Sequence, residues 1–330
     1  MDRSGSIIVT GGAGYVGSHV CKALAAHGYS PVAYDDLSTG TRDVVKWGPF
    51  ELGDIGDRDR LAEMFLRLRP VAVLHLAALV VDPNSMFDPD NFYKTNVAGS
   101  LNLLRAMVEA QISKLVYCSG SAVYGMPEAN PVAESQPLDA ITPYGTSMLM
   151  TERTLPDFAR SVDLDWIALR PFNVAGADPD GDTGPSPHDT KHLIPSAIRA
   201  AIGECDGLDV YGADYDTLDG TAVRDFVHVS DVAEAHVSAL GRILDGERAA
   251  TINIGSGQGY SVKQVIESVE RISGRLLPLA EAPPRPGDPP VLVADIAVAE
   301  EVLGWQPQHT DLDEIIKTAW DWRTSPKSSH

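Results

Sequence analysis

Three glycines give the chain its clearest chemical signal. Gly11, Gly14 and Gly17 lie in the segment TGGAGYVG, between an apolar run and an amphipathic helical pattern. Glycines at such a turn allow a pyrophosphate to approach the backbone, and the helix N-terminus offers N–H groups and the positive end of its dipole. Asp35 ends the next apolar run, eighteen residues after Gly17, where a carboxylate binds an adenosine ribose and repels a 2′-phosphate. These residues predict a dinucleotide site that takes NAD rather than NADP.

The elements that must position these residues alternate along the first half of the chain. Apolar runs predict strands at 7–9, 31–34, 50–52, 71–76, 115–119 and 166–170, and helical patterns cover 15–27, 61–68, 92–110 and 143–161. Helices between successive strands require crossover connections and therefore a parallel sheet covered on both faces. The strands are almost entirely apolar, as expected for a sheet buried on both sides. The fold class predicted is α/β, a Rossmann-type doubly wound parallel sheet.

The second half of the chain has a different character. Residues 175–187 are rich in Gly, Pro and Asp, and a Pro-rich stretch covers 282–290, which is typical of long loops. The stretches 226–236 and 251–254 look like chain that returns to the main sheet. We therefore expect an NAD-binding Rossmann domain at 1–172 that also receives about 225–255. Residues 173–224 and 256–330 would form a smaller, discontinuous α/β substrate-binding domain.

Composition excludes several classes of partner. The 330 residues carry 26 Lys and Arg against 46 Asp and Glu, a formal net charge of −20. Such a surface repels nucleic-acid backbones and anionic lipids. No apolar run reaches the roughly 18 residues of a membrane-spanning helix, and the first residues lack a signal-peptide apolar region. Cys21, Cys118 and Cys205 are scattered, which predicts neither disulfides nor a zinc site and favours a reducing cytoplasm.

One acidic pattern has the spacing of metal ligands. Asp178, Asp180 and Asp182 alternate as in a calcium loop, but the flanking helices and the closing Glu of such a loop are absent. We expect no metal site here.

The order and spacing of motifs over nearly the whole chain resemble a known family. The G-x-x-G-x-x-G spacing is similar to that of the extended short-chain dehydrogenase/reductase superfamily, and within it the chain resembles the UDP-glucose (UDP-galactose) 4-epimerase family. The segments that carry the resemblance are 10–19, DDLSTG at 35–40, SAVYG at 121–125, PYG at 143–145, RPFN at 170–173, HLIP at 192–195, DGTAVRDFVHV at 219–229 and RPGDPP at 285–290.

The resemblance implies a reaction. Members of the family hold NAD, oxidise the C4 hydroxyl of a UDP-hexose, and return the hydride to the other face of a transient 4-keto sugar. It assigns the acid/base role on the C4 oxygen to Tyr144, and it implies a homodimer formed by the helices at 92–110 and 143–161. The implied cofactor-binding residues are Gly11, Gly14, Tyr15, Val16, Gly17, Asp35, Asp36, Asp54, Ile55, Leu76, Ala77, Ala78, Asn96 and Tyr144.

The resemblance also implies a UDP-sugar site, formed by Tyr124, Asn173, His192, Leu193, Arg224, Arg285 and Asp288. Arg224 and Arg285 suit a diphosphate, because guanidinium groups bind phosphate through charge-assisted forks. Two alternatives stay open at this point. Tyr124 could pack in the interior instead of contacting the sugar, and Asn96 could organise hydrogen bonds instead of contacting the cofactor.

Two positions depart from the family pattern. Met148 stands where the family has a lysine, four residues after Tyr144, and Gly120 stands where it has Ser or Thr. A free tyrosine has a pKa near 10, so only about one in a thousand is ionised at pH 7. Methionine cannot stabilise the phenolate, and positioned acid–base catalysis is worth about 10²–10⁴ in rate. Ser119 and Ser121 flank Gly120 and could supply a working hydroxyl, or they could merely cap the strand.

The sequence therefore predicts an NAD-dependent nucleotide-sugar 4-epimerase-like protein that acts on a UDP-hexose. Two alternatives remain. One is another nucleotide-sugar-modifying enzyme, a dehydratase or decarboxylase, although the Asp-Glu pair typical of dehydratases is missing at Ser119-Gly120-Ser121. The other is a catalytically impaired protein that binds NAD and a UDP-sugar.

Overall fold

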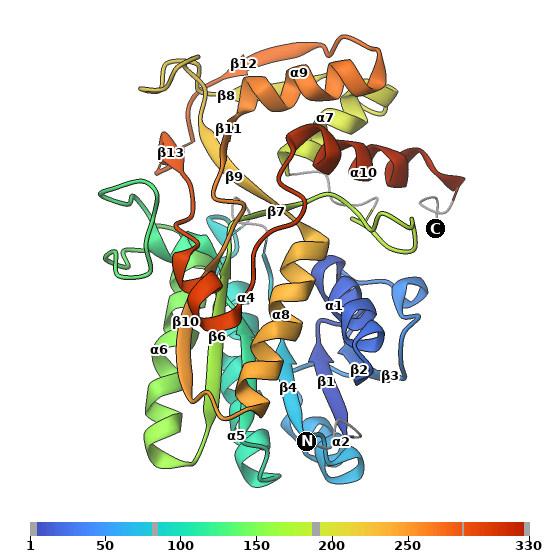
Figure 1. Ribbon diagram of the computed structural model, residues 1–330, viewed down its shortest axis with the longest axis vertical. Coiled ribbons are helices and arrows are strands. Elements are labelled where there is room, and N and C mark those ends of the chain that lie inside the picture. Colours follow the sequence, from blue (N-terminus) through green and yellow to red (C-terminus); the bar gives the residue numbers. More distant parts are fainter. Residues whose placement is uncertain (1–4, 81–84, 187–191, 286, 327–330) are drawn as a thin grey trace.

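The centre of the molecule is a seven-stranded parallel sheet. The computed structural model describes residues 5–80, 85–186, 192–285 and 287–326 (Figure 1). The strand order is β10–β6–β5–β4–β1–β2–β3, and every neighbouring pair is parallel. The strands are β1 (Ser6–Thr10), β2 (Ser30–Asp35), β3 (Phe50–Leu52), β4 (Ala72–His75), β5 (Lys114–Cys118), β6 (Asp165–Pro171) and β10 (Ala249–Ile254). This confirms the predicted fold class.

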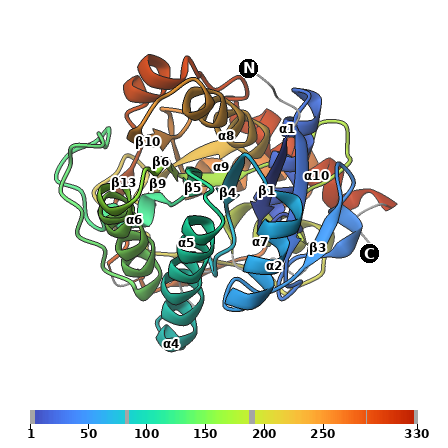
Figure 2. The same cartoon turned by 90° about the horizontal axis from the view of Figure 1, so that it is seen from below.

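Both faces of this sheet are covered by helices. The side chains of β1 alternate, so that Ile7 and Val9 join one apolar core and Ile8 joins the other. The helices are α1 (Tyr15–Ala26) and α8 (Val229–Leu244) on the first face, and α2 (Arg58–Leu68), α5 (Ser100–Glu109) and α6 (Pro143–Ser161) on the second. Seen from below, α8 lies on one side of the strands and α5 and α6 on the other (Figure 2). Burial on both faces explains why the strands are so uniformly apolar.

The helix predicted at 92–110 has an irregular first half. It begins as α4 (Pro89–Phe92), continues as a π-helical segment, η2 (Tyr93–Gly99), and ends as α5. Hydroxyl groups replace regular helical partners within it, since Ser100 Oγ and Thr151 Oγ1 both donate to the carbonyl oxygen of Asn96, at 2.5 and 2.9 Å. Such π-bulges are frequent at functional sites.

The remaining elements form a second region. One sheet has the order β11–β9–β13, with β7 paired to β9, and a separate two-stranded sheet pairs β12 with β8. The elements are β7 (Asn173–Ala175), α7 (Leu193–Ile202), β8 (Leu208–Tyr211), β9 (Val223–His228), β11 (Gly259–Ser261), α9 (Val262–Ser273), β12 (Leu279–Ala282), β13 (Val291–Leu292) and α10 (Leu312–Thr324). Helices α7, α9 and α10 share a core of their own. Short helical turns complete the chain: η1 (Arg42–Val44), η3 (Ser121–Tyr124) and η4 (Ala299–Leu303).

The chain passes between the two regions more than once. As expected, 251–254 lies in the main sheet, as part of β10 beside β6. The segment expected to return at 226–236 divides. Strand β9 is hydrogen-bonded into the second sheet, although Val227 reaches the core beneath it, and α8 packs on the main sheet. In addition, Ala299 and Leu303 of η4 belong to the same core as α8. The exact limits of separable domains stay a prediction.

Within the described ranges, none of the helices combines the length and the apolar composition needed to cross a bilayer.

Candidate active site

The glycine turn lies at the carboxyl end of β1, pressed against neighbouring backbone. Gly11 has φ +70°, and a Cβ there would lie 2.8 Å from the amide nitrogen of Ala77. A Cβ on Gly17 would lie 2.0 Å from the carbonyl oxygen of Gly11. Helix α1 then begins behind the N-cap Gly14, with no side chain capping it and no acidic residue in its first turn. Its N-terminus is thus a cradle of the kind that binds pyrophosphate.

Asp35 ends β2 next to this turn. Its Oδ2 accepts from the amide of Ala13 at 3.0 Å, and its Oδ1 accepts from the amide of Leu37 at 2.8 Å. Burial raises the pKa of this carboxyl, and the two amide hydrogen bonds oppose that shift. Each carboxylate oxygen has a second lone pair, so Asp35 both holds the glycine turn and retains capacity for a ribose hydroxyl.

The ends of the neighbouring strands complete this side of the site. His75, the last residue of β4, contacts Thr10 Oγ1 through Nδ1 at 2.7 Å and Ser100 Oγ through Nε2 at 2.8 Å. Burial lowers the pKa of His75 to about 4, so the imidazole is neutral. The next amides follow β1 closely, because Leu76 N donates to Thr10 O and Ala77 N to Thr10 Oγ1.

The other predicted cofactor residues surround the same edge of the sheet. Asp54 accepts from the amide of Gly56 at 2.7 Å, and Ile55 is buried. Asn96 is almost fully buried, and its side chain bonds both backbone groups of Leu79 and the hydroxyl of Ser147. This geometry favours the organising role of Asn96, which holds the segment after β4 against α6.

Tyr144 stands at the start of α6. Thr142 caps this helix by accepting from the amide of Gly145. A Cβ on Gly145 would lie 2.5 Å from the carbonyl oxygen of Ala122, so α6 meets η3 at close range. The ring of Phe92 meets the ring of Tyr144 edge to face, with centroids 6.4 Å apart. The phenol is therefore held by backbone approach and by packing.

The two departures from the family pattern lie against this tyrosine. A Cβ built on Gly120 would lie 3.2 Å from the hydroxyl oxygen of Tyr144, and its next neighbour would be 4.0 Å away. Met148 is buried one turn along α6, and its Sδ lies 3.6 Å from Tyr117 Oη and 3.9 Å from Asn96 Nδ2. The thioether thus packs in the interior and brings no charge to the phenol.

Ser119 and Tyr124 belong to a buried polar network. Ser119 Oγ donates to Glu152, which Arg170 grips with two nitrogens at 3.0 and 2.6 Å. Arg170 also donates to Tyr124 Oη at 2.8 Å, and that hydroxyl donates to Asn253 at 2.6 Å. Tyr124 has no exposed surface. These contacts favour the packing role for Tyr124 and a structural role for Ser119.

Ser121 is placed differently. It begins η3 directly after Gly120 and is half-buried. In the part of the chain that the structure covers, its hydroxyl has no hydrogen-bond partner. Of the two serines considered, Ser121 is the one with a hydroxyl free to turn toward a ligand.

The predicted diphosphate residues meet in the second region. Arg224, on β9, donates to its neighbour's carbonyl at 2.7 Å and pairs with Asp288. The guanidinium of Arg285 lies 4.2 Å above the ring of Tyr211. Tyr215 lies close enough to Arg224, Arg285 and Asp288 for their charges to act on it. Its hydroxyl is buried without a hydrogen-bond partner in the described ranges.

The other predicted substrate residues approach from two elements. Asn173 begins β7 and pairs in register with Phe226 of β9, two residues after Arg224. His192 is the exposed N-cap of α7, and Leu193 is the first residue of that helix.

Sequence reasoning missed three groups. Tyr211 and Tyr215 precede the motif at 219–229 and carry no signal of their own. The Glu152–Arg170 pair joins α6 to β6, and only Arg170 lies in one of the motifs. Lys22 binds the three alternating aspartates at 2.7 to 3.1 Å. The spacing of these aspartates was the available signal, because three neighbouring carboxylates need a cation, and here a lysine of the same chain supplies it.

Comparison with known proteins places these features in context. The sequence matches the NAD dependent epimerase/dehydratase family over residues 7–255. A UDP-glucose 4-epimerase of Rhizobium meliloti (strain 1021) is 44% identical over 322 residues, covering 98% of each chain. The crystal structure of UDP-glucose 4-epimerase from Brucella ovis in complex with NAD has a TM-score of 0.93 at 44% identity, covering 96% of this chain and 98% of the other. That of UDP-glucose-4-epimerase from Stenotrophomonas maltophila with bound NAD and formylated UDP-arabinopyranose has a TM-score of 0.93 at 39% identity, covering 96% and 97%.

Proposed function

The chain belongs to the NAD dependent epimerase/dehydratase family, and we propose that it binds NAD and a UDP-hexose and interconverts the C4 epimers of that sugar. The reaction passes through a transient 4-keto sugar, and Tyr144 is its acid/base. The relatives' name, UDP-glucose 4-epimerase, suggests UDP-glucose as one substrate. Inversion of its C4 gives UDP-galactose, the other member of the pair.

The residues present fit NAD. The glycine turn leaves no room for a Cβ, the N-terminus of α1 is uncapped, and Asp35 stands beside both. Gly11 to Gly17 would hold the pyrophosphate and Asp35 the adenosine ribose. When bound, the nicotinamide accepts and returns the hydride of the sugar C4.

Tyr144 handles the proton of the same carbon. In the forward step its phenolate accepts the proton of the C4 hydroxyl as the C4–H bond breaks, which leaves a carbonyl. In the return step the phenol gives that proton back to the C4 oxygen. Met148 supplies no ammonium that could stabilise the phenolate of Tyr144. We therefore expect turnover to be slow.

The UDP moiety would lie on the second region. Arg224 and Arg285 supply two guanidinium groups to the diphosphate, and Asp288 orients the first of them. Asn173, His192 and Leu193 line the approach from β7 and α7. The positive groups that an anionic ligand needs are thus concentrated locally in a chain with a net charge of −20.

One observation carries the proposal: a Cβ at Gly120 would lie 3.2 Å from the hydroxyl oxygen of Tyr144. The position at which the family has Ser or Thr is therefore next to this phenol, which supports an acid/base role for Tyr144. The test is to incubate the purified protein with UDP-galactose and follow UDP-glucose. We expect slow conversion that Tyr144→Phe abolishes. A 6-deoxy-4-keto sugar as product would instead favour the dehydratase alternative. Release of CO2 from a UDP-hexuronate in a parallel incubation, which leaves a UDP-pentose, would favour the decarboxylase alternative.

Met148 and Gly120 favour a second candidate function. With a buried thioether at one position and no side chain at the other, the protein would bind NAD and a UDP-sugar without turnover. Wild-type conversion that depends on Tyr144 would exclude this candidate. Saturable UDP-glucose binding with no conversion would support it.

The oligomeric state and location are part of the proposal. Helices α5 and α6 cover one face of the main sheet and carry exposed side chains, among them Arg105, Met150 and Arg153. We expect these two helices to form the interface of a homodimer. Light scattering behind a sizing column would give a mass of twice 35.3 kDa. Cys21, Cys118 and Cys205 are all free thiols, which agrees with a cytoplasmic location.

A further inference from the structure

A loop that no motif covers crosses between the two regions. Residues 176–186, here called the strap, lead from β7 toward α7 (Figure 1). The yellow-green strap lies between α1 below and α10 above. It therefore connects the helix that opens the NAD site with the helix bundle of the second region.

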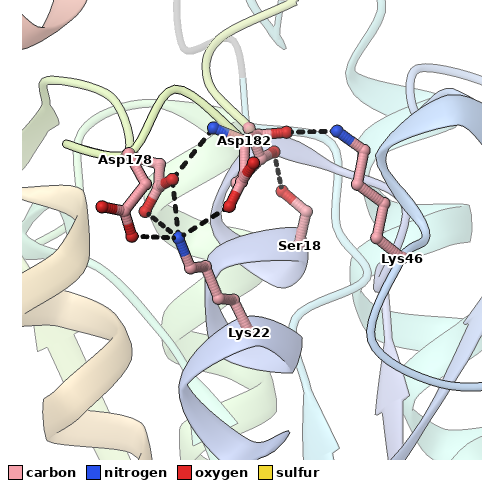
Figure 3. Close-up of polar contacts among 7 residues, drawn as sticks. Ser18, Lys22, Lys46, Asp178 and Asp182 are labelled. Atoms are coloured by element: carbon pink, nitrogen blue, oxygen red, sulfur yellow. Dashed lines mark hydrogen bonds and ion pairs between the residues drawn. The ribbon is translucent and has the colours of Figure 1, made fainter. Parts of the chain in front are cut away.

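The lower side of the strap is bound to α1 and its surroundings. Lys22 Nζ lies among three strap carboxylates, 2.7 Å from Asp178, 2.8 Å from Asp180 and 3.1 Å from Asp182 (Figure 3). Ser18 Oγ lies 2.8 Å from Thr183 Oγ1.

Two further contacts continue this row of anchors. Lys46 Nζ donates to the carbonyl oxygen of Asp182 (Figure 3). At the start of the strap, Tyr15 Oη donates to Gly176 O at 2.7 Å. Tyr15 is the first residue of α1, so the strap begins on the helix end that we assign to the cofactor.

The upper side of the strap is bound to α10. The amide of Ala177 donates to Thr318 Oγ1 at 3.1 Å, and Trp322 Nε1 donates to Pro185 O at 3.0 Å. A Cβ on Gly184 would lie 2.5 Å from the Trp322 ring, so the contact is close. Helix α10 shares its core with α7 and α9. The contacts between the strap and α1 therefore also hold the core of α7, α9 and α10 next to the main sheet.

Lys22 is the charge on which this arrangement depends. Carboxylate oxygens of the three aspartates lie within 4.8 Å of one another, and Asp178 is buried. Burial acts to lower the pKa of Lys22, but the hydrogen bonds that its ammonium donates to the three carboxylates outweigh burial, and the pKa is raised. Removal of the ammonium would leave three like charges together, one of them out of water, which is strongly unfavourable.

We propose that Lys22 is a positioning residue: by neutralising the strap aspartates it fixes the second region over α1, so that a UDP-hexose bound there faces the NAD site. This inference rests on the proposed function for its ligand. Lys22 touches neither ligand and acts through Asp178 and the strap.

The test compares Lys22→Met with Lys317→Met. Lys317 is a matched control, because it forms an exposed i,i+4 ion pair with Asp321 on α10. UDP-glucose is titrated into each NAD-loaded protein by calorimetry, and NAD affinity is measured separately by fluorescence. We expect Lys22→Met to bind UDP-glucose at least about tenfold more weakly, equivalent to about 1.4 kcal/mol, with NAD affinity within about threefold of wild type.

Charge restoration separates positioning from simple damage. Lys22→Arg keeps the positive charge and should recover UDP-glucose affinity to within about threefold, while Lys317→Met should match wild type. Unchanged UDP-glucose affinity in folded Lys22→Met would overturn the proposal. So would an equal loss of NAD and UDP-glucose affinity, since that would indicate general destabilisation.

A ligand-free measurement keeps the two proposals distinguishable. Limited proteolysis should cut the strap faster in Lys22→Met than in wild type, and Lys22→Arg should restore protection. If wild type binds no UDP-glucose, the proposed function fails. Proteolysis alone then tests the anchoring by Lys22. Equal cleavage rates of the strap in Lys22→Met and wild type would refute it.

Discussion

The parts of the molecule that we propose to bind phosphate and the surroundings of Tyr144 are built from opposite kinds of groups. The parts proposed to bind phosphate offer an uncapped helix end and two guanidinium groups. Around Tyr144 the neighbours at the two family positions are a missing side chain and a buried thioether. The first set is polar or charged, and the second brings neither a hydroxyl nor a charge to the phenol.

Under the proposed function, ligand binding and proton transfer therefore depend on separate groups of the chain. Gly120 has an extended backbone, φ −174° and ψ 163°, which any residue can adopt. Met148 fills its place as an apolar packing residue. Neither residue is needed for the cofactor turn or for the arginine cluster, so the two parts can be altered independently.

The largest effect is expected from restoring both groups. Gly120→Ser needs the Tyr144 hydroxyl to yield by only a few tenths of an ångström, and Met148→Lys brings an ammonium to α6. Positioned acid–base groups are worth about 10²–10⁴ in rate, so the double variant should epimerise UDP-galactose faster by about that factor. The control is the double variant carrying Tyr144→Phe, which should be inactive. Equal rates for wild type and the double variant would show that Gly120 and Met148 do not limit proton transfer.

The next effect tests the phosphate side. Arg224→Met removes a largely buried guanidinium, and loss of a buried, hydrogen-bonded charge costs about 2–5 kcal/mol. We expect UDP-glucose affinity to fall about 10²-fold with NAD affinity unchanged, measured by calorimetry. Arg248→Met is the matched control, because Arg248 forms an exposed ion pair with Asp163. If both variants bind alike, the arginine cluster is not the diphosphate site.

A smaller effect is expected for cofactor choice. Asp35→Ala removes the carboxylate that repels a 2′-phosphate, and the ratio of NADP to NAD affinity should rise about tenfold. Fluorescence titration with each cofactor gives this ratio. Asp36→Ala, one residue later on the exposed side, should change it less. A larger rise of this affinity ratio in Asp36→Ala would indicate that Asp36, and not Asp35, contacts the ribose.

The last effect is on folding stability rather than on ligand affinity or rate, and it concerns the neutral imidazole beneath the glycine turn. The pKa of His75 is about 4 in the folded chain against about 6.5 when unfolded. Its contribution to stability is therefore complete above pH 6.5 and is lost as the pH falls toward 4, because the unfolded state binds one more proton. His75→Gln removes this pH-dependent contribution. As the pH falls from 6.5 toward 4, the free energy of unfolding of wild type should therefore fall relative to that of the variant by about 1.4 kcal/mol per pH unit. Urea unfolding at several pH values measures it, and a constant difference between the two proteins would show that His75 does not titrate this way.

Most of the sheet could be predicted from the sequence, because β1, β2 and β4 are short apolar runs that end on residues with recognisable chemistry. The glycine turn and Asp35 were predictable for the same reason. The course of β9 was not, since an apolar run does not say which of two sheets it joins. The Ser119–Glu152–Arg170–Tyr124 network was not predictable either, because its members are far apart in the chain and meet only through the packing of α6 against β5 and β6.

We propose that the protein binds both ligands while proton transfer at Tyr144 is impaired. The most direct test of this claim is made on one NAD-loaded sample: UDP-glucose binding by calorimetry, then the rate of UDP-galactose formation, beside the Gly120→Ser/Met148→Lys variant. We predict saturable binding of similar strength in both proteins, with wild-type turnover at least about 10²-fold slower. Absence of UDP-glucose binding, or wild-type turnover as fast as that of the variant, would contradict the claim.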